Sequence, residues 1–240
     1  MQEKTNGIVL HTVKHTDSTS IATIYTQQFG RVAYMIYGTG KKKAVCRSAF
    51  FQPLSIVEID VSHIPSKEIQ RIKDIRIAFP LINIPAYPVK NAIALFLSET
   101  LFRILIRTES DEQLYRFLET SILYLDICEC GLANFHLVFL LKLAGYLGFE
   151  PNIDEQNDGY FDLAEGVFLR EKPFHKQFLS LEESADLQRM LLADFDTMSD
   201  VVLSREKRVQ LLENIITFYK LHIPDFHGVH SLEVLQSLFD

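Results

Sequence analysis

Short runs rich in β-branched residues dominate the first 80 positions of the chain. They occupy residues 7–14, 19–26, 31–37 and 50–61, and a fifth run at 70–79 interleaves isoleucine with charged residues. Such runs, bounded by Gly, Asn, Asp and Ser, are typical of strands. No segment between them carries a helical pattern long enough for a β-α-β unit. Five short strands in this arrangement predict a small closed barrel.

A helical period replaces the strand pattern after Pro80, Pro85 and Pro88. Proline lacks a backbone donor and resists regular structure, so this group indicates a linker between two domains. Apolar residues then recur at helical spacing in 92–105, 111–128, 134–147, 181–195 and 204–221, with Ser204 as an N-cap and a further short helix expected within 231–239.

Residues 150–175 interrupt the helical pattern with Gly, Pro and Asp, which indicates an irregular excursion. The pattern therefore predicts an α+β protein. A five-stranded barrel is expected at residues 1–80, and an all-α helical domain at 81–240 with its excursion at 150–175.

Charge divides the chain at the same place. The whole chain has a net charge of -7. Residues 1–80 carry 11 Lys and Arg against 6 Asp and Glu, a net +5, and the remainder carries 13 against 25, a net -12. Such asymmetry predicts different partners for the two parts.

A basic strand and loop at residues 30–47 account for much of the positive charge. The segment holds five cations, two tyrosines and no acid. In a strand, Arg31 and Tyr37 share one face, whereas Tyr34 lies on the apolar face. Cations neutralise phosphates and an exposed tyrosine stacks on a base, so this surface suits DNA. The predicted DNA contacts are Arg31, Tyr37, Lys41, Lys42, Lys43 and Arg47; the alternative is a solvated hairpin with an ordinary lysine run.

The sequence offers no catalytic constellation. The Gly38-Thr39-Gly40-Lys41 run is not a phosphate-binding loop, because Met35 stands where that motif needs glycine and Lys42 replaces the required Ser or Thr. Neither a Gly-x-Ser-x-Gly elbow nor a His-Glu-x-x-His pair occurs. The chain is therefore predicted not to be an enzyme.

No metal, cofactor or membrane span is expected. Cys128 and Cys130 have the wrong spacing for a zinc ribbon, and the histidines at 222, 227 and 230 fit a polar turn better than a zinc site. Three cysteines that form no disulfide framework favour a reducing, cytoplasmic compartment. Polar residues within 132–149 favour a buried helix over a membrane-spanning one.

The chain resembles the RecO family of bacterial recombination mediators, in order along almost its whole length. The opening Gly7-Ile8-Val9-Leu10 and the later Phe29-Gly30-Arg31-Val32, followed by a glycine-rich basic loop, resemble its N-terminal signature. Leu-Lys-Leu-Ala-Gly-Tyr-Leu-Gly-Phe-Glu-Pro at 141–151 resembles its central helix, and Tyr-Lys-Leu-His-Ile-Pro at 219–224 with Ser-Leu-Glu-Val-Leu at 231–235 resembles its ending.

The resemblance implies an N-terminal oligonucleotide/oligosaccharide-binding (OB) barrel and a helical C-terminal domain. It also implies binding of single- and double-stranded DNA, strand annealing, and loading of RecA, together with RecR, onto DNA coated by single-stranded DNA-binding protein (SSB). Many members hold a four-cysteine zinc module in the excursion, where this chain has no cysteine. Packing through Tyr160, Phe161, Leu163 and Phe168 is expected to take its place.

The resemblance further implies a pocket for the SSB tail in the helical domain. That tail ends in acidic residues and a Phe carboxylate, so the pocket needs an apolar hole rimmed by cations. The candidates are Arg103, Arg107, Lys142 and Arg205. The rival interpretation of the whole chain is a protein-interaction adaptor whose basic barrel binds an acidic protein and has no direct role on DNA.

Overall fold

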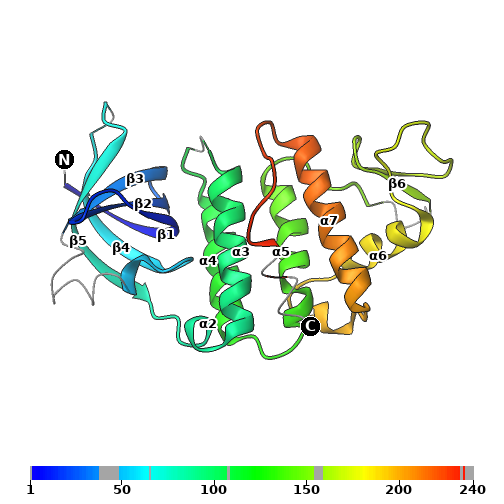
Figure 1. The fold of residues 1–240 in the computed structure, drawn as a ribbon, viewed down its shortest axis with the longest axis horizontal. Coiled ribbons are helices and arrows are strands. Elements are labelled where there is room, and N and C mark those ends of the chain that lie inside the picture. Colours follow the sequence, from blue (N-terminus) through cyan, green and yellow to red (C-terminus); the bar gives the residue numbers. More distant parts are fainter. Residues whose placement is uncertain are drawn as a thin grey trace. The chain divides into compact units, whose positions relative to one another are not determined.

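The computed structural model describes residues 2–37, 49–64, 66–106, 109–153, 159–232 and 235. The chain forms two compact units, Met1–Asp126 and Ile127–Asp240. The first unit contains the barrel together with helices α2, α3 and α4, and the second contains the remaining helices and a small hairpin (Figure 1). Packing thus divides the chain at Asp126, within the region expected to form the helical domain. The division into domains at 1–80 and 81–240 stays a prediction.

A closed five-stranded barrel forms the N-terminal part, as predicted. Its strands follow the order β1-β2-β3-β5-β4, with β3 and β5 parallel and the other pairs antiparallel. This is the arrangement of an OB-type barrel. The strands are β1 (Gln2–Lys14), β2 (Thr19–Thr26), β3 (Gly30–Tyr37), β4 (Ile56–Ser62) and β5 (Ile69–Phe79).

The fourth predicted strand is wrong in its first half. Residues Ala49–Phe51 form a short 3-10 helix, η1, and the strand begins only at Ile56. Leu54 lies between them with a positive φ of 60°. Its backbone N–H donates to the carbonyl of Val9 at 2.9 Å, which fixes this turn against β1.

The barrel interior is filled by the alternate residues of its strands. Along β3, Val32, Tyr34 and Ile36 are buried, whereas their neighbours are more accessible. Glycine at position 7 permits close contact between strands, because a Cβ there would lie 2.5 Å from Cγ2 of the buried Ile24. The packed interior is formed by Val9, Ala22, Ile24, Val32, Tyr34, Ile36, Phe51, Val57, Ile59 and Val61.

The proline-rich segment is ordered rather than a bare linker. Residues Asn83–Ala86 form the short helix α2, and Pro88 is the first residue of α3 (Pro88–Ile104). Proline suits this position because its missing N–H would have no partner inside the helix. The carboxylate of Asp126, near the end of α4 (Glu112–Ile127), accepts from the backbone N–H groups of residues 82, 83 and 84. Helix α3 packs along β1, where Ser98 Oγ donates to the Leu10 carbonyl at 2.6 Å.

The second unit is built around α5 (Leu132–Tyr146), which is buried on nearly every side, as predicted. Helices α6 (Leu181–Leu191) and α7 (Arg205–His222) pack against it, with the short 3-10 helix η2 (Met198–Asp200) between them. Ser204 caps α7 by accepting from the N–H of Lys207 at 3.3 Å, which confirms the predicted cap. The Tyr219 hydroxyl joins α7 to α5 by donating to the Leu140 carbonyl at 2.7 Å.

The excursion is more regular than the sequence indicates. Strands β6 (Tyr160–Asp162) and β7 (Val167–Leu169) form an antiparallel hairpin beside α6 and α7 (Figure 1). Phe161 packs between Phe168 and Phe218 of α7, with ring centroids 4.9 and 5.8 Å away. The predicted packing is confirmed for Phe161, Leu163 and Phe168, which are buried. Tyr160 is half-buried and contacts the ring of Phe178.

In the part of the chain that the structure describes, no helix combines the length and apolarity needed to cross a membrane. The apolar sequence around residue 140 is instead explained by the position of α5 in the core of its unit.

Candidate nucleic-acid interface and a cationic pocket

An exposed cation–aromatic pair lies at the end of β3. Tyr37, the last residue of the strand, is 51% exposed. The guanidinium carbon of Arg71 on β5 lies 5.3 Å from the centroid of its ring. An aromatic face beside a guanidinium is the combination that binds bases and phosphates of single strands.

Arg71 was not among the residues predicted from the sequence. It reaches Tyr37 because β3 and β5 pair in parallel, with Met35 opposite Arg71. The two positions are 34 residues apart in the sequence, so the contact depends on barrel closure. One indication of Arg71 is present in the sequence: it lies in the strand predicted at 70–79, where charged residues interleave with isoleucine.

The other tyrosine of β3 has a different environment. Tyr34 is fully buried, and burial raises the pKa of its hydroxyl above the ordinary value. The faces predicted for residues 31–37 are therefore confirmed: Tyr34 belongs to the core and Tyr37 to the surface.

Arg31 is engaged with the protein itself. Its guanidinium donates to the carbonyls of Phe102 and Leu105, the latter at 2.9 Å, and lies 4.6 Å from the Phe102 ring centroid. These carbonyls belong to the C-terminal end of α3, where a cation is favourable. Burial lowers the pKa of this guanidinium. The contacts give Arg31 a structural role between barrel and helix, and its predicted phosphate contact stays a prediction.

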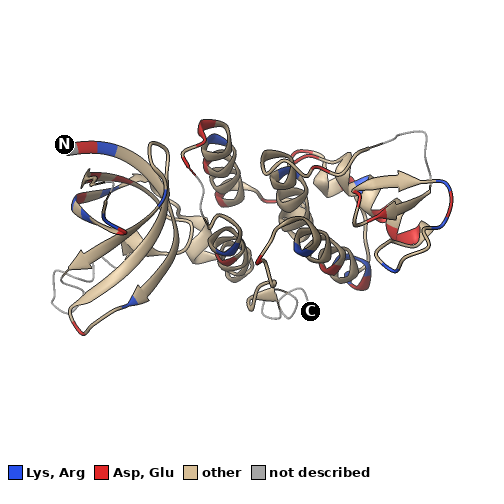
Figure 2. Cartoon of the chain, turned by 90° about the horizontal axis from the view of Figure 1, so that it is seen from above, with Lys and Arg blue, Asp and Glu red and all other residues tan. Residues whose placement is uncertain are grey.

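The rest of the predicted DNA surface lies outside the described residues. This applies to Lys41, Lys42, Lys43 and Arg47, which follow β3 in the sequence. Their role as phosphate contacts stays a prediction. Elsewhere on the barrel, charges of both signs alternate (Figure 2), and Arg76 is paired with Glu58 at 2.7 Å. The charge-assisted hydrogen bond from Arg76 lowers the pKa of the Glu58 carboxyl.

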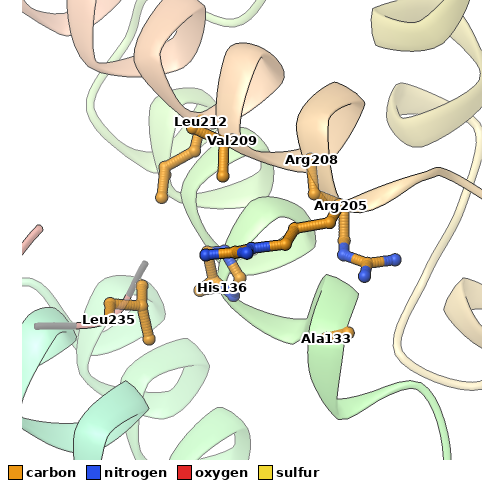
Figure 3. A pocket seen from close by; sticks show the side chains of 7 residues that line it. All are labelled: Ala133, His136, Arg205, Arg208, Val209, Leu212 and Leu235. Atoms are coloured by element: carbon orange, nitrogen blue, oxygen red, sulfur yellow. The ribbon is translucent and has the colours of Figure 1, made fainter. Parts of the chain in front are cut away.

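A small pocket lies between α5 and α7 in the second unit. Its volume is about 20 Å³, and it combines apolar walls with two arginines. Figure 3 shows one of the two arginine side chains extending to His136 and the other pointing away from it. The lining residues are Ala133, His136, Arg205, Arg208, Val209, Leu212 and Leu235.

His136 forms the floor of this pocket and is fully buried from solvent. Burial, and to a smaller extent the nearby positive charge of Arg208, lowers the pKa of its imidazole to about 3. Arg208 is held in place by donating to the Leu203 carbonyl at 2.7 Å. The pocket thus places two guanidinium groups beside a neutral histidine.

The four cations predicted to bind the SSB tail belong to different parts of the chain, and their role in that binding stays a prediction. Arg205 lines the pocket, while Arg103 belongs to α3 of the first unit and is paired with Glu99 at 2.8 Å. Lys142 is half-buried on α5, and its charge contributes to the lowered pKa of Asp194, after hydrogen bonds from Thr197. Arg107 lies outside the described residues. Arg208, which sequence reasoning missed, lies one helical turn after Arg205 and so lines the same pocket.

Metal-ligating side chains show no comparable gathering. Across the described ranges, no group of three or more His, Cys, Asp or Glu is placed to hold a metal ion. Of the two cysteines that the structure describes, Cys128 is buried and Cys130 exposed, and both are free thiols.

The chain thus joins a closed OB-type barrel, which carries an exposed aromatic–guanidinium pair, to a helical unit. The family model described as the N terminal of recombination protein O matches residues 1–80, and the one for its C terminal matches residues 87–231. The chain belongs to the recombination protein O (RecO) family.

Curated relatives agree with this assignment over the full length. The chain is 38% identical over 242 residues to the DNA repair protein RecO of Bacteroides fragilis, with 100% of each chain covered. It is 36% identical over 240 residues to the protein of that name from Phocaeicola vulgatus, and 34% identical over 241 residues to that from Flavobacterium psychrophilum, again with 100% of each covered.

Proposed function

We propose that this chain is a non-enzymatic, cytoplasmic mediator of DNA repair and recombination. It binds single- and double-stranded DNA through its barrel and anneals complementary strands. Together with RecR, it helps to load RecA onto SSB-coated DNA. Family membership and relatives named DNA repair protein support the repair role.

The observation that carries the DNA-binding proposal is the Tyr37–Arg71 pair on the closed barrel. Tyr37 presents a half-exposed ring for stacking, and Arg71 supplies a cation at 5.3 Å. Three consecutive lysines follow within six residues of Tyr37 in the sequence. An aromatic ring can stack on any base, and phosphate contacts do not depend on the base sequence. The proposed DNA binding is therefore independent of the DNA sequence.

Annealing of SSB-coated complementary strands tests the proposed function. Wild type is expected to accelerate duplex formation, and the K41E/K42E/K43E variant to lose most of that acceleration. A control with equal charge change reverses the exposed cations Lys14, Arg116 and Lys220, and should anneal like wild type. Equal loss in both triple variants would instead assign the effect to net charge.

Competition separates this function from that of a protein adaptor. If the barrel binds DNA, excess oligonucleotide displaces any acidic partner that depends on Lys41, Lys42 and Lys43. A wild-type chain that binds no oligonucleotide but retains such a partner would contradict the proposal.

For the SSB partner, the pocket between α5 and α7 is the best-supported site. Its apolar walls and two arginines match an acidic tail that ends in phenylalanine. A volume of about 20 Å³ accommodates roughly one water molecule, so an aromatic ring enters only when a wall moves. Leu235, which follows α7 in the chain, is the wall that we expect to move.

Binding of a labelled SSB-tail peptide, followed by fluorescence anisotropy, tests this site. Charge reversal at Arg205 or Arg208 should weaken binding, and Leu235→Ala should strengthen it by enlarging the pocket. The other predicted cations, Arg103, Arg107 and Lys142, are also replaced by residues of opposite charge, and peptide binding by these variants is measured in the same way. If the arginine and Leu235 variants all bind like wild type, the tail binds elsewhere or not at all.

A further inference from the structure

The excursion ends in a loop that presents a fully exposed aromatic ring. The side chain of Phe174 is 108% exposed, more than any other large apolar side chain that the structure describes. Exposing a phenylalanine forgoes the stability that its burial would provide. Full exposure leaves this ring accessible to a ligand, and the charged residues next to it in the sequence indicate what kind of ligand it would suit.

Hydrogen bonds, one of them to a buried carboxylate, hold this loop in position. His175, the next residue, lies with its Nε2 2.9 Å from Oδ2 of Asp162, whose carboxylate is buried in the hairpin. The backbone N–H of Gln177 donates to Nδ1 of His175 at 3.1 Å, so Nε2 carries the proton that is donated to Asp162. The Leu163 N–H donates to the Gln177 carbonyl at 2.9 Å, which closes the loop on its other side.

Three cations lie within four residues of the exposed ring in the sequence. Arg170, Lys172 and Lys176 are exposed, and Glu171 is the only acid between residues 170 and 177. The Lys172 ammonium lies 5.3 Å from the ring centroid of Phe178, which restrains its position beside the loop.

We propose that this loop is a second contact for single-stranded DNA, in which a base stacks on Phe174 and Lys172, Lys176 and Arg170 bind flanking phosphates. The inference rests on the proposed DNA-binding function and extends it to the second unit. One isolated ring among cations suits a base better than it suits a protein partner, which would need a contiguous apolar surface. A single ring is likewise too little for stable anchoring in a membrane.

The absence of tryptophan from the chain provides a direct test. Phe174→Trp creates a single reporter whose fluorescence is quenched when a base stacks on it. Titration with a thymidine oligonucleotide is expected to quench this emission in parallel with binding measured by anisotropy. The control is Leu181→Trp, which places the tryptophan at a half-exposed position in the same unit. Glu182 and Glu183 follow this position and disfavour DNA there, so the emission of the control tryptophan should stay unchanged.

Affinity and salt dependence complete the test. Phe174→Ala is expected to weaken oligonucleotide binding by about tenfold. The K172Q/K176Q variant should reduce the log–log salt slope by about 1.4, because each single-strand phosphate contact contributes about 0.7.

The outcomes distinguish this inference from the proposed function. Saturated binding without quenching of the Phe174→Trp reporter overturns the loop contact and leaves the barrel surface intact. Quenching of the reporter by an acidic peptide, but not by the oligonucleotide, would also overturn the loop contact with DNA. If wild type binds no oligonucleotide at all, the proposed function itself fails.

Discussion

At the level of single residues, Arg31 illustrates how one sequence pattern supports two roles. Strand alternation correctly placed it with Tyr37 and away from Tyr34. The sequence also predicts the helix at 92–105, but not that the carbonyls at the end of this helix, α3, accept from the guanidinium of Arg31. A cation predicted for DNA thus has a structural partner 71 residues away.

Arg31→Met should lower stability much more than it changes DNA binding. Methionine keeps much of the side-chain bulk but leaves two carbonyls without their charged donor, which costs about 1.5–3 kcal/mol for such a bond. Urea denaturation measures the loss. The salt slope of oligonucleotide binding should match that of wild type; a slope smaller by about 0.7 would show that Arg31 contacts a phosphate after all.

The buried His136 should make stability depend on pH. Its pKa is about 3 in the folded chain against 6.5 ordinarily, so unfolding takes up a proton below pH 6.5. The contribution of the neutral imidazole to the free energy of unfolding is therefore fully present above pH 6.5. It decreases on acidification, by at most about 1.4 kcal/mol per pH unit.

Denaturation midpoints and free energies between pH 7 and 4.5 test this expectation. His136→Gln removes the titrating group while keeping a polar side chain of similar size, so its free energy of unfolding should fall less steeply with acidification. Parallel pH profiles for wild type and variant would show that His136 is protonated in the folded chain.

At the level of elements, the helix and strand boundaries that were predicted wrongly are those that depend on contacts between distant segments of the chain. Regular strands and helices followed from β-branching and helical period, including β5, α5 and α7. The prolines at 85 and 88 were interpreted as a linker, because nothing in the local sequence shows that Asp126 will accept three backbone N–H groups there. The β6–β7 hairpin was missed because each strand has only three residues.

The excursion should depend on aromatic packing for its stability. Phe161→Ala removes a ring that contacts Phe168 and Phe218, and such a loss typically costs about 3–5 kcal/mol. Phe174→Ala is the matched control, because its exposed ring makes no comparable contribution. Equal denaturation midpoints for the two variants would contradict packing as the force that holds the excursion.

At the level of the whole molecule, charge and fold divide at different places. The positive charge of residues 1–80 belongs to the barrel, while the packed unit extends to Asp126 and includes two further helices of substantial length. The candidate interface was only partly predictable. Tyr37 follows from strand alternation, whereas Arg71 requires the β3–β5 pairing, and the pocket of Arg205 and Arg208 requires α7 to pack on α5.

The salt dependence of single-stranded DNA binding tests the central claim most directly. Fluorescence anisotropy of a labelled oligonucleotide would give the dissociation constant for wild type and for the K41E/K42E/K43E variant over a range of salt concentrations. If about five phosphates are contacted, the wild-type log–log slope should be near about -3.5 to -4.5, and the variant should lose both affinity and most of that slope. A wild-type affinity that does not change with salt would contradict phosphate binding by the barrel.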